Sequence, residues 1–235
     1  MLGLDERIAG LSDEGSVLVV LLVALLLGLR HAMDPDHIAA VTTLVASTRE
    51  RAAQRAGRLG AWWGLGHALT LIVFGIPIVL FERFLPEPLQ RGAETAVAAL
   101  IVFLAARLLI RWRSGYFHAH AHAHPPHEHE HRHQVRSPLG AFAIGLVHGL
   151  GGSAGVGVLL LAAIPSRPLA VASLVVLAVF TAVSMTMLTT GFGSVLVRPR
   201  VRGAHVVLAP ALGLTSLAFG LWYAAAAWAL APYPF

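Results

Sequence analysis

Six long apolar runs constrain what this chain can fold into. A membrane-spanning helix needs about 20 mainly apolar residues. Six segments meet that requirement: Ser16–Ser47, Ala61–Phe81, Ala93–Ile110, Leu139–Ile164, Pro168–Gly191 and His205–Ala231. Only 12% of the residues are charged, about half the share in an average soluble domain. The sequence predicts an all-α, polytopic membrane protein with six transmembrane helices and a single domain over residues 1–235.

The arginines between these runs predict the orientation. All 17 basic residues are arginines, and eleven of them follow the first, third and fifth runs, against four on the opposite side. Basic residues concentrate in the cytoplasmic loops of membrane proteins. We therefore expect both termini outside the cell (inner) membrane. Topology accounts for the positive charge, so no nucleic-acid partner is expected.

The first run contains a polar stretch, Arg30–His37, with three charged side chains. Each charge costs about 2.5–3.5 kcal/mol at the centre of a membrane helix. Arg30 and Asp34 are four residues apart and can pair on a helix, but that pairing leaves Asp36 unexplained. The cost indicates either a compensating partner or a function.

Pro35 predicts that the long first helix is broken near this residue, because proline lacks an N–H group and disfavours helix at the preceding position. On a straight helix, His31 and His37 would lie about 120° apart, whereas a break allows them to converge. Two imidazoles with Asp36 form a ligand set that suits Ni, Co, Zn or Cu(II). We predict a metal site here, supported by Arg30, Asp34 and Pro35. A kinked helix with paired charges and a proton relay are the alternatives.

A Gly-Leu-x-His element recurs at Gly28–His31, Gly64–His67 and Gly145–His148. The recurrence makes His67 and His148 further candidate metal ligands, although a histidine that only bonds neighbouring helices is the alternative. The first and fourth runs are offset by three helices, so they would cross the membrane in opposite directions. This predicts an inverted 3+3 repeat of the kind found in transporters, with chance recurrence as the alternative.

The loop over residues 112–137 contains eight of the 13 histidines. They are His118, His120, His122, His124, His127, His129, His131 and His133. Such a segment cannot form a packed core, so we expect a flexible cytoplasmic loop. Dense imidazoles bind divalent first-row metals. The loop is therefore predicted to be a metal buffer, sensor or donor, with a solvated linker as the alternative.

The stretch Arg30–Ile38 resembles the H-x4-D-H signature of the nickel/cobalt transporter (NiCoT/NicO) family, with His31, Asp36 and His37 in the signature positions. Gly64–Ala68 resembles the second, L-G-H-S-type motif of that family. The resemblance implies transport of Ni(II) or Co(II) as substrate, without an organic cofactor.

The later part of the chain departs from the usual eight-span pattern of the family. The stretch His148–Gly155, with Ser153 as a supporting residue, is closer to the shorter branch that is associated with urease accessory membrane proteins. That likeness implies a cytoplasmic metallochaperone or urease-type maturation proteins as candidate partners. The histidine-rich loop also resembles the efflux branch.

Two other classes of function remain open. A membrane accessory protein would bind metal without transporting it, and would lose that binding on deletion of His118–His133. An intramembrane metal-dependent hydrolase would place an open metal site in the membrane. The chain has no H-E-x-x-H motif, and we expect no glutamate in a span to act as its base, so no enzyme is predicted.

Overall fold

The computed structural model describes residues 2–45, 52–81, 86–114, 137–151, 158, 161–196, 198, 201 and 205–232. Its helices are α1 (Leu2–His31), α2 (Pro35–Val45), α3 (Ala52–Phe81), α4 (Glu87–Arg113), α5 (Pro138–His148), α7 (Arg167–Leu196) and α9 (His205–Ala227). Regular structure in these ranges is entirely helical, which confirms the predicted all-α class.

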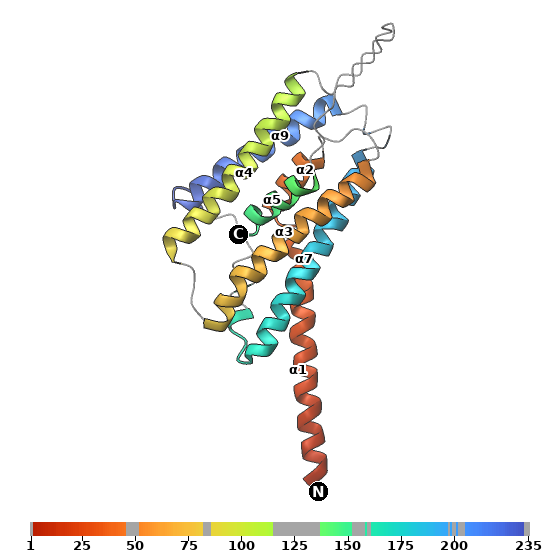
Figure 1. The fold of residues 1–235 in the computed structure, drawn as a ribbon, viewed down its shortest axis with the longest axis vertical. Helices are drawn as coiled ribbons and strands as arrows, with labels where there is room; N and C mark the ends of the chain where they lie inside the picture. The colour runs from red at the N-terminus through yellow and green to blue at the C-terminus, as the bar shows by residue number, and fades with distance from the viewer. Residues whose placement is uncertain are drawn as a thin grey trace.

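Two pairs of long helices form the frame of the molecule (Figure 1). Helix α3 lies along α7, and α4 lies along α9. The short helices α2 and α5 lie between the pairs: α5 contacts α3 and α4, and α2 contacts α4, α7 and α9. Helix α1 packs on α7. The short helices therefore end inside the bundle, where they bring polar residues to its centre.

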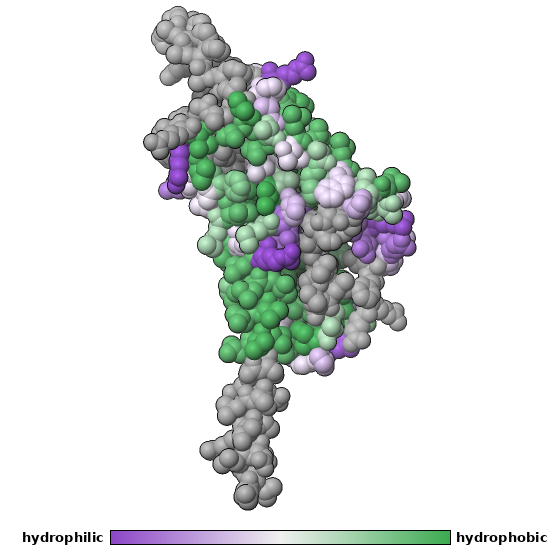
Figure 2. Space-filling model, turned by 180° about the vertical axis from the view of Figure 1, so that it is seen from behind, coloured by the Kyte–Doolittle hydropathy of each residue, from purple (hydrophilic) through white to green (hydrophobic). Residues whose placement is uncertain are grey.

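Four helices are long and apolar enough to cross a membrane alone, namely α3, α4, α7 and α9. Helices α1 and α2 form a fifth, broken span, in which Val17–His31 and Pro35–Thr43 are bent by 46°. Large apolar side chains such as Leu18, Phe103 and Val207 are 60–70% exposed on the outside of these helices. Figure 2 shows a largely hydrophobic face, as expected of a surface that lies against lipid.

The predicted break of the first span lies at Pro35. The amide of Met33 donates to the carbonyl of Arg30, and the amide of Asp34 donates to that of His31, so α1 ends in a tight turn. Proline suits the first helical position because its missing N–H is not needed there. Helix α2 then starts with a bond from the Ile38 amide to the Asp34 carbonyl.

The predicted fourth span does not form one continuous helix over Leu139–Ile164. Helix α5 ends at His148, and Gly149 follows as its C-cap. The sequence then continues with further glycines, which disfavour helix. Among the described residues, the structure therefore has four single spans, one broken span and the short apolar α5. Neither the count of six nor the inverted repeat is confirmed, and both stay predictions.

Glycines bring the backbones of α3 and α5 into direct contact. A Cβ atom at Gly66 would lie 2.2 Å from the Phe142 carbonyl oxygen, and one at Gly145 would lie 2.1 Å from that of Trp63. Small residues allow such close helix packing in membranes. The hydroxyl of Thr70 also donates to the Leu146 carbonyl at 3.0 Å. This contact fixes α5 against the middle of α3.

We expect Gly145→Ala to destabilise the protein, because the new methyl group would force the two helix backbones apart. Overpacking of this kind typically costs about 1–3 kcal/mol. Thermal unfolding of the purified protein in detergent would show a lower midpoint. The matched control is Gly92→Ala, because nothing lies within 4 Å of a Cβ atom there. Equal midpoints for the two variants would contradict the proposed role of this contact.

Candidate metal centre

Five side chains that the sequence predicts as ligands meet at the centre of the bundle. His31 is the last residue of α1, Asp36 and His37 lie in the first turn of α2, His67 lies midway along α3, and His148 ends α5. His31 is 6% exposed and the other four are fully buried. Because the first span is broken and α5 is short, their polar side chains lie at one buried point.

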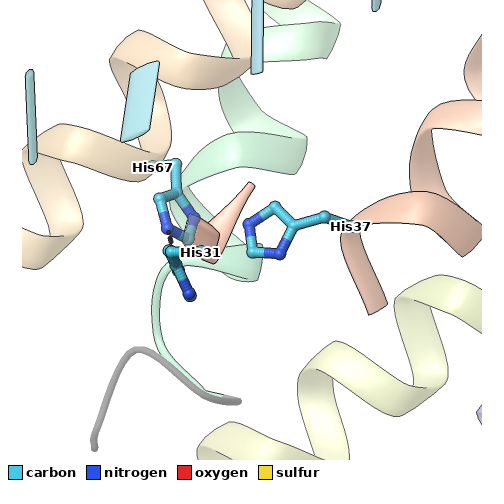
Figure 3. A group of neighbouring side chains, drawn as sticks. All are labelled: His31, His37 and His67. Atoms are coloured by element: carbon cyan, nitrogen blue, oxygen red, sulfur yellow. Dashed lines mark hydrogen bonds between the residues drawn. The ribbon is translucent and has the colours of Figure 1, made fainter. Parts of the chain in front are cut away.

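The three imidazoles of His31, His37 and His67 form a first triad (Figure 3). The Nε2 atoms of His31 and His67 are 3.0 Å apart. The ring centroid of His37 is 4.6 Å from that of His31 and 5.0 Å from that of His67. One potential ligand atom from each residue lies within 4.8 Å of the others, which is close enough for all three to bind one ion.

A second triad consists of Asp36, His37 and His148, whose potential ligand atoms also lie within 4.8 Å of one another. Asp36 Oδ2 lies 3.4 Å from His148 Nε2, and Asp36 Oδ1 lies 3.1 Å from His37 Nδ1. The ring centroids of His37 and His148 are 4.5 Å apart. His37 therefore belongs to both triads.

Several nitrogen atoms of this cluster have no hydrogen-bond partner within the described residues. They are His37 Nε2, His67 Nδ1 and both ring nitrogens of His148. Buried polar atoms are nearly always hydrogen-bonded in proteins, because an unpaired one costs about 1–3 kcal/mol. A cation bound by these lone pairs would remove that cost. These residues are therefore suited to act as ligands of a metal ion.

The helix ends favour a cation at the same point. Helices α1 and α5 both end there, at His31 and His148, and the C-terminus of a helix carries about half a negative charge. The N-terminus of α2 carries the opposite partial charge, but Asp36 lies in its first turn. The backbone therefore adds a negative potential where the imidazoles meet.

A comparison with protein families identifies the chain. The sequence model of NicO, described as a high-affinity nickel-transport protein, matches residues 17–206. The chain belongs to the NicO family. This family consists of transport proteins and is not a class of enzymes. With its apolar spans, this NicO chain is an integral membrane protein.

Two curated relatives support the assignment to NicO. The urease accessory protein UreH of a Bacillus species is 26% identical over 214 residues, which cover 90% of this chain and 92% of the relative. A high-affinity nickel transport protein of Cupriavidus necator is 32% identical over 116 residues, or 46% of this chain and 33% of that protein. No solved structure matches the chain.

In this NicO chain, Asp34 holds His31 in place. Asp34 Oδ2 lies 3.1 Å from His31 Nδ1, and Arg30 Nη2 lies 3.9 Å from the other carboxylate oxygen. When Nδ1–H of His31 donates to Asp34, its Nε2 lone pair faces His67. A carboxylate that orients a histidine in this way raises its basicity as a metal ligand. The predicted pairing of Arg30 with Asp34 is present, with Arg30 on the exposed side.

The Gly-Leu-x-His elements have a shared packing role in the NicO fold. A Cβ atom at Gly28 would lie 2.5 Å from the Leu177 carbonyl oxygen, and one at Gly64 would lie 2.9 Å from Ala182 Cα. Gly145 makes the corresponding contact with α3. Residues three apart share one face of a helix, so each histidine lies one turn beyond a close contact between two helices.

One residue beside the site and one further buried acid were not predicted from the sequence. Trp63 is fully buried, and its ring lies 5.7 Å from that of His37 and 5.6 Å from that of His148. Its spacing of four residues from His67 places both on one face of α3, which is the signal that could have revealed it. Glu94 is 6% exposed on α4 and accepts from Gln90 Nε2 at 3.1 Å. It lies inside the predicted span Ala93–Ile110, and an acidic residue within an apolar run is the signal that could have revealed it.

Some predicted residues lie outside the part of the chain that the structure describes. Ser153 lies in the gap 152–157, and the eight loop histidines lie in the gap 115–136. Their roles as supporting and loop metal-binding residues stay predictions.

We expect Asp34→Asn to lower the affinity for Ni(II) by about 10–100-fold, because outer carboxylates that orient histidine ligands have effects of that size. Calorimetric titration of the purified protein in nanodiscs would measure the change, with the loop histidines replaced by asparagine. The matched control is Arg30→Gln. Arg30 is 72% exposed and only 3.9 Å from Asp34, and exposed ion pairs contribute little. An equal loss in both variants would contradict the orienting role of Asp34.

Proposed function

We propose that this NicO chain carries Ni(II) or Co(II) across the cell membrane. In this proposal the ion binds to His31, Asp36, His37, His67 and His148. The observation that carries the proposal is that four imidazoles and a carboxylate are buried at one point of a membrane bundle. Ionisable side chains inside a membrane are costly and are retained where they line an ion pathway.

The chemistry of the ligand set supports a first-row transition metal as substrate. Imidazole nitrogens with a carboxylate oxygen suit Ni(II), Co(II), Zn(II) and Cu(II). The chain contains no cysteine, so thiolate ligands that favour softer metals are absent. The name of the Cupriavidus necator relative specifies nickel, which favours Ni(II) and its chemical neighbour Co(II) over Zn(II) and Cu(II).

Charge balance explains how a divalent ion can leave water at this point. Asp34 and Asp36 are buried and together offset the two positive charges of the ion. The side chain of Arg30 is 72% exposed and its Nη2 lies 3.9 Å from Asp34 Oδ1, so its positive charge is not buried with the cluster. The imidazoles replace the water ligands of the ion, and the ends of α1 and α5 add favourable potential. Binding requires the neutral imidazole form of each histidine, because only that form has a lone pair for the ion.

The arginine distribution supports an orientation with both termini outside the inner membrane and the histidine-rich loop in the cytoplasm. In that orientation, the loop over residues 112–137 collects or buffers metal on the cytoplasmic side. The likeness to a urease accessory protein supports a cytoplasmic metallochaperone or urease-type maturation protein as the partner that exchanges metal with this loop.

A membrane accessory protein without transport activity is the second candidate function. The relative named as a urease accessory protein covers nearly the whole chain, and this observation favours that alternative. It requires metal to be bound by the chain but not released on the other side of the membrane.

We expect His37→Ala to reduce Ni(II) flux into liposomes at least about tenfold, because His37 belongs to both triads and removal of one ligand weakens binding strongly. A fluorescent indicator inside the vesicles would report the flux. The control is Thr215→Ala, because this exposed hydroxyl donates to the Ala211 carbonyl of its own helix. Equal flux in both variants would contradict the proposed site. Stoichiometric binding by the unaltered chain without flux would favour the accessory function.

Replacing the eight loop histidines with asparagine should lower the number of Ni(II) ions bound per chain but leave flux unchanged at saturating metal. The reason is that a flexible loop buffers metal without forming the path across the membrane. Equilibrium dialysis and the liposome assay would measure the two quantities. A loss of flux as large as that of His37→Ala would contradict the buffering role.

A further inference from the structure

The five clustered side chains are not all equally close to one another. His37 is central, since its ring lies 4.5–5.0 Å from the rings of His31, His67 and His148. The rings of His67 and His148 are 6.0 Å apart. The ligand atoms accordingly group as two triads that share His37, and not as one shell of five.

The two nitrogens of His37 serve different sides of the cluster. Nδ1 lies 3.1 Å from Asp36 Oδ1 and so belongs to the side of Asp36 and His148. Figure 3 shows that the ring edge farther from α2, which carries Nε2, faces His31 and His67. Nε2 is buried and has no hydrogen-bond partner within the described ranges. A neutral imidazole carries one proton and one lone pair, so the ring binds an ion through Nε2 while Nδ1–H bonds to Asp36. It binds an ion through Nδ1 only when its proton lies on Nε2.

We propose that the cluster provides two successive positions for one metal ion. One position consists of the imidazoles of His31, His37 and His67, and the other consists of Asp36, His37 and His148. The ion passes between them by exchanging its partners around His37 without returning to water, and the single ring proton of His37 shifts from Nδ1 to Nε2 as the ion moves from the first position to the second. This inference rests on the proposed transport function and specifies how the same site works.

The two positions differ in charge but resemble each other in their backbone setting. The first lies at the C-terminus of α1 through His31, and the second lies at the C-terminus of α5 through His148. Only the second includes a carboxylate ligand, so we expect it to hold a divalent ion more tightly. Two divalent ions that share one imidazole would repel each other strongly, so the positions are occupied one at a time.

Division of the ligands into two weaker positions suits a transporter. An ion must bind well enough to leave water, yet weakly enough to be released on the other side. A single shell of four imidazoles and a carboxylate would hold Ni(II) or Co(II) too firmly for rapid release. With two positions, each step exchanges only two ligands, while His37 remains close to the ion throughout.

The test uses Co(II) as the probe, because its visible absorption reports the number and type of its ligands. The full-length chain is placed in nanodiscs with the eight loop histidines replaced by asparagine, so that only the buried cluster contributes. His67→Gln and His148→Gln each remove one position, and His37→Gln removes both. His67→Asn and His148→Asn serve as second variants if a glutamine variant does not fold, and Thr215→Ala is the control.

We expect the parent and the control to bind one Co(II) ion. His67→Gln and His148→Gln should each still bind one ion, with different absorption spectra. His67→Gln should keep nearly the parent affinity, because the tighter position with Asp36 remains, whereas His148→Gln should lower the affinity by about tenfold or more. Liposome flux should fall at least about tenfold in both. His37→Gln should lose both binding and flux.

Three results would overturn the two positions while leaving the transport function intact. These are complete loss of binding in both His67→Gln and His148→Gln, identical spectra for these two variants, or two ions bound at once by the parent. Undiminished flux in His37→Gln would instead overturn the site assigned under the proposed function. The two kinds of failure are therefore distinguishable.

Discussion

The cost of burying polar side chains in an apolar bundle is the constraint on which the rest of the structure depends. Four imidazoles and the carboxylate of Asp36 lie at one point with at most 6% exposure. Buried groups of this kind require partners, because unsatisfied polar atoms and uncompensated charges are expensive in a low dielectric. The contacts among these side chains, the ends of α1 and α5, and Asp34 each reduce that cost.

Close helix packing makes the convergence geometrically feasible. The short helices α2 and α5 end inside the bundle, between the α3/α7 pair and the α4/α9 pair. Glycines allow α5 to approach α3 and allow α1 to approach α7 at backbone distance. Each Gly-Leu-x-His element thus combines a packing contact with a buried histidine one turn later. The same feature of the sequence therefore supports both the fold and the candidate metal centre.

Membership of the NicO family and the buried cluster support the same proposal from independent directions. The family match covers residues 17–206 and so includes every residue of the two triads. The cluster itself is recognised by burial, distances and unpaired nitrogens, without reference to relatives. Trp63 is fully buried, and its ring packs against those of His37 and His148 on one side of the cluster.

The sequence by itself determined the all-α class, the apolar spans and the break near Pro35, because these depend on local composition and on the backbone chemistry of proline. It also singled out the five clustered side chains, since charges and histidines are conspicuous in apolar runs. Only the tertiary structure decided that α5 stops at His148, that Trp63 lies against the cluster and that the ligand atoms divide into two triads around His37. These features depend on how helices far apart in the sequence pack, and the spacing of residues along one helix does not encode distances between helices.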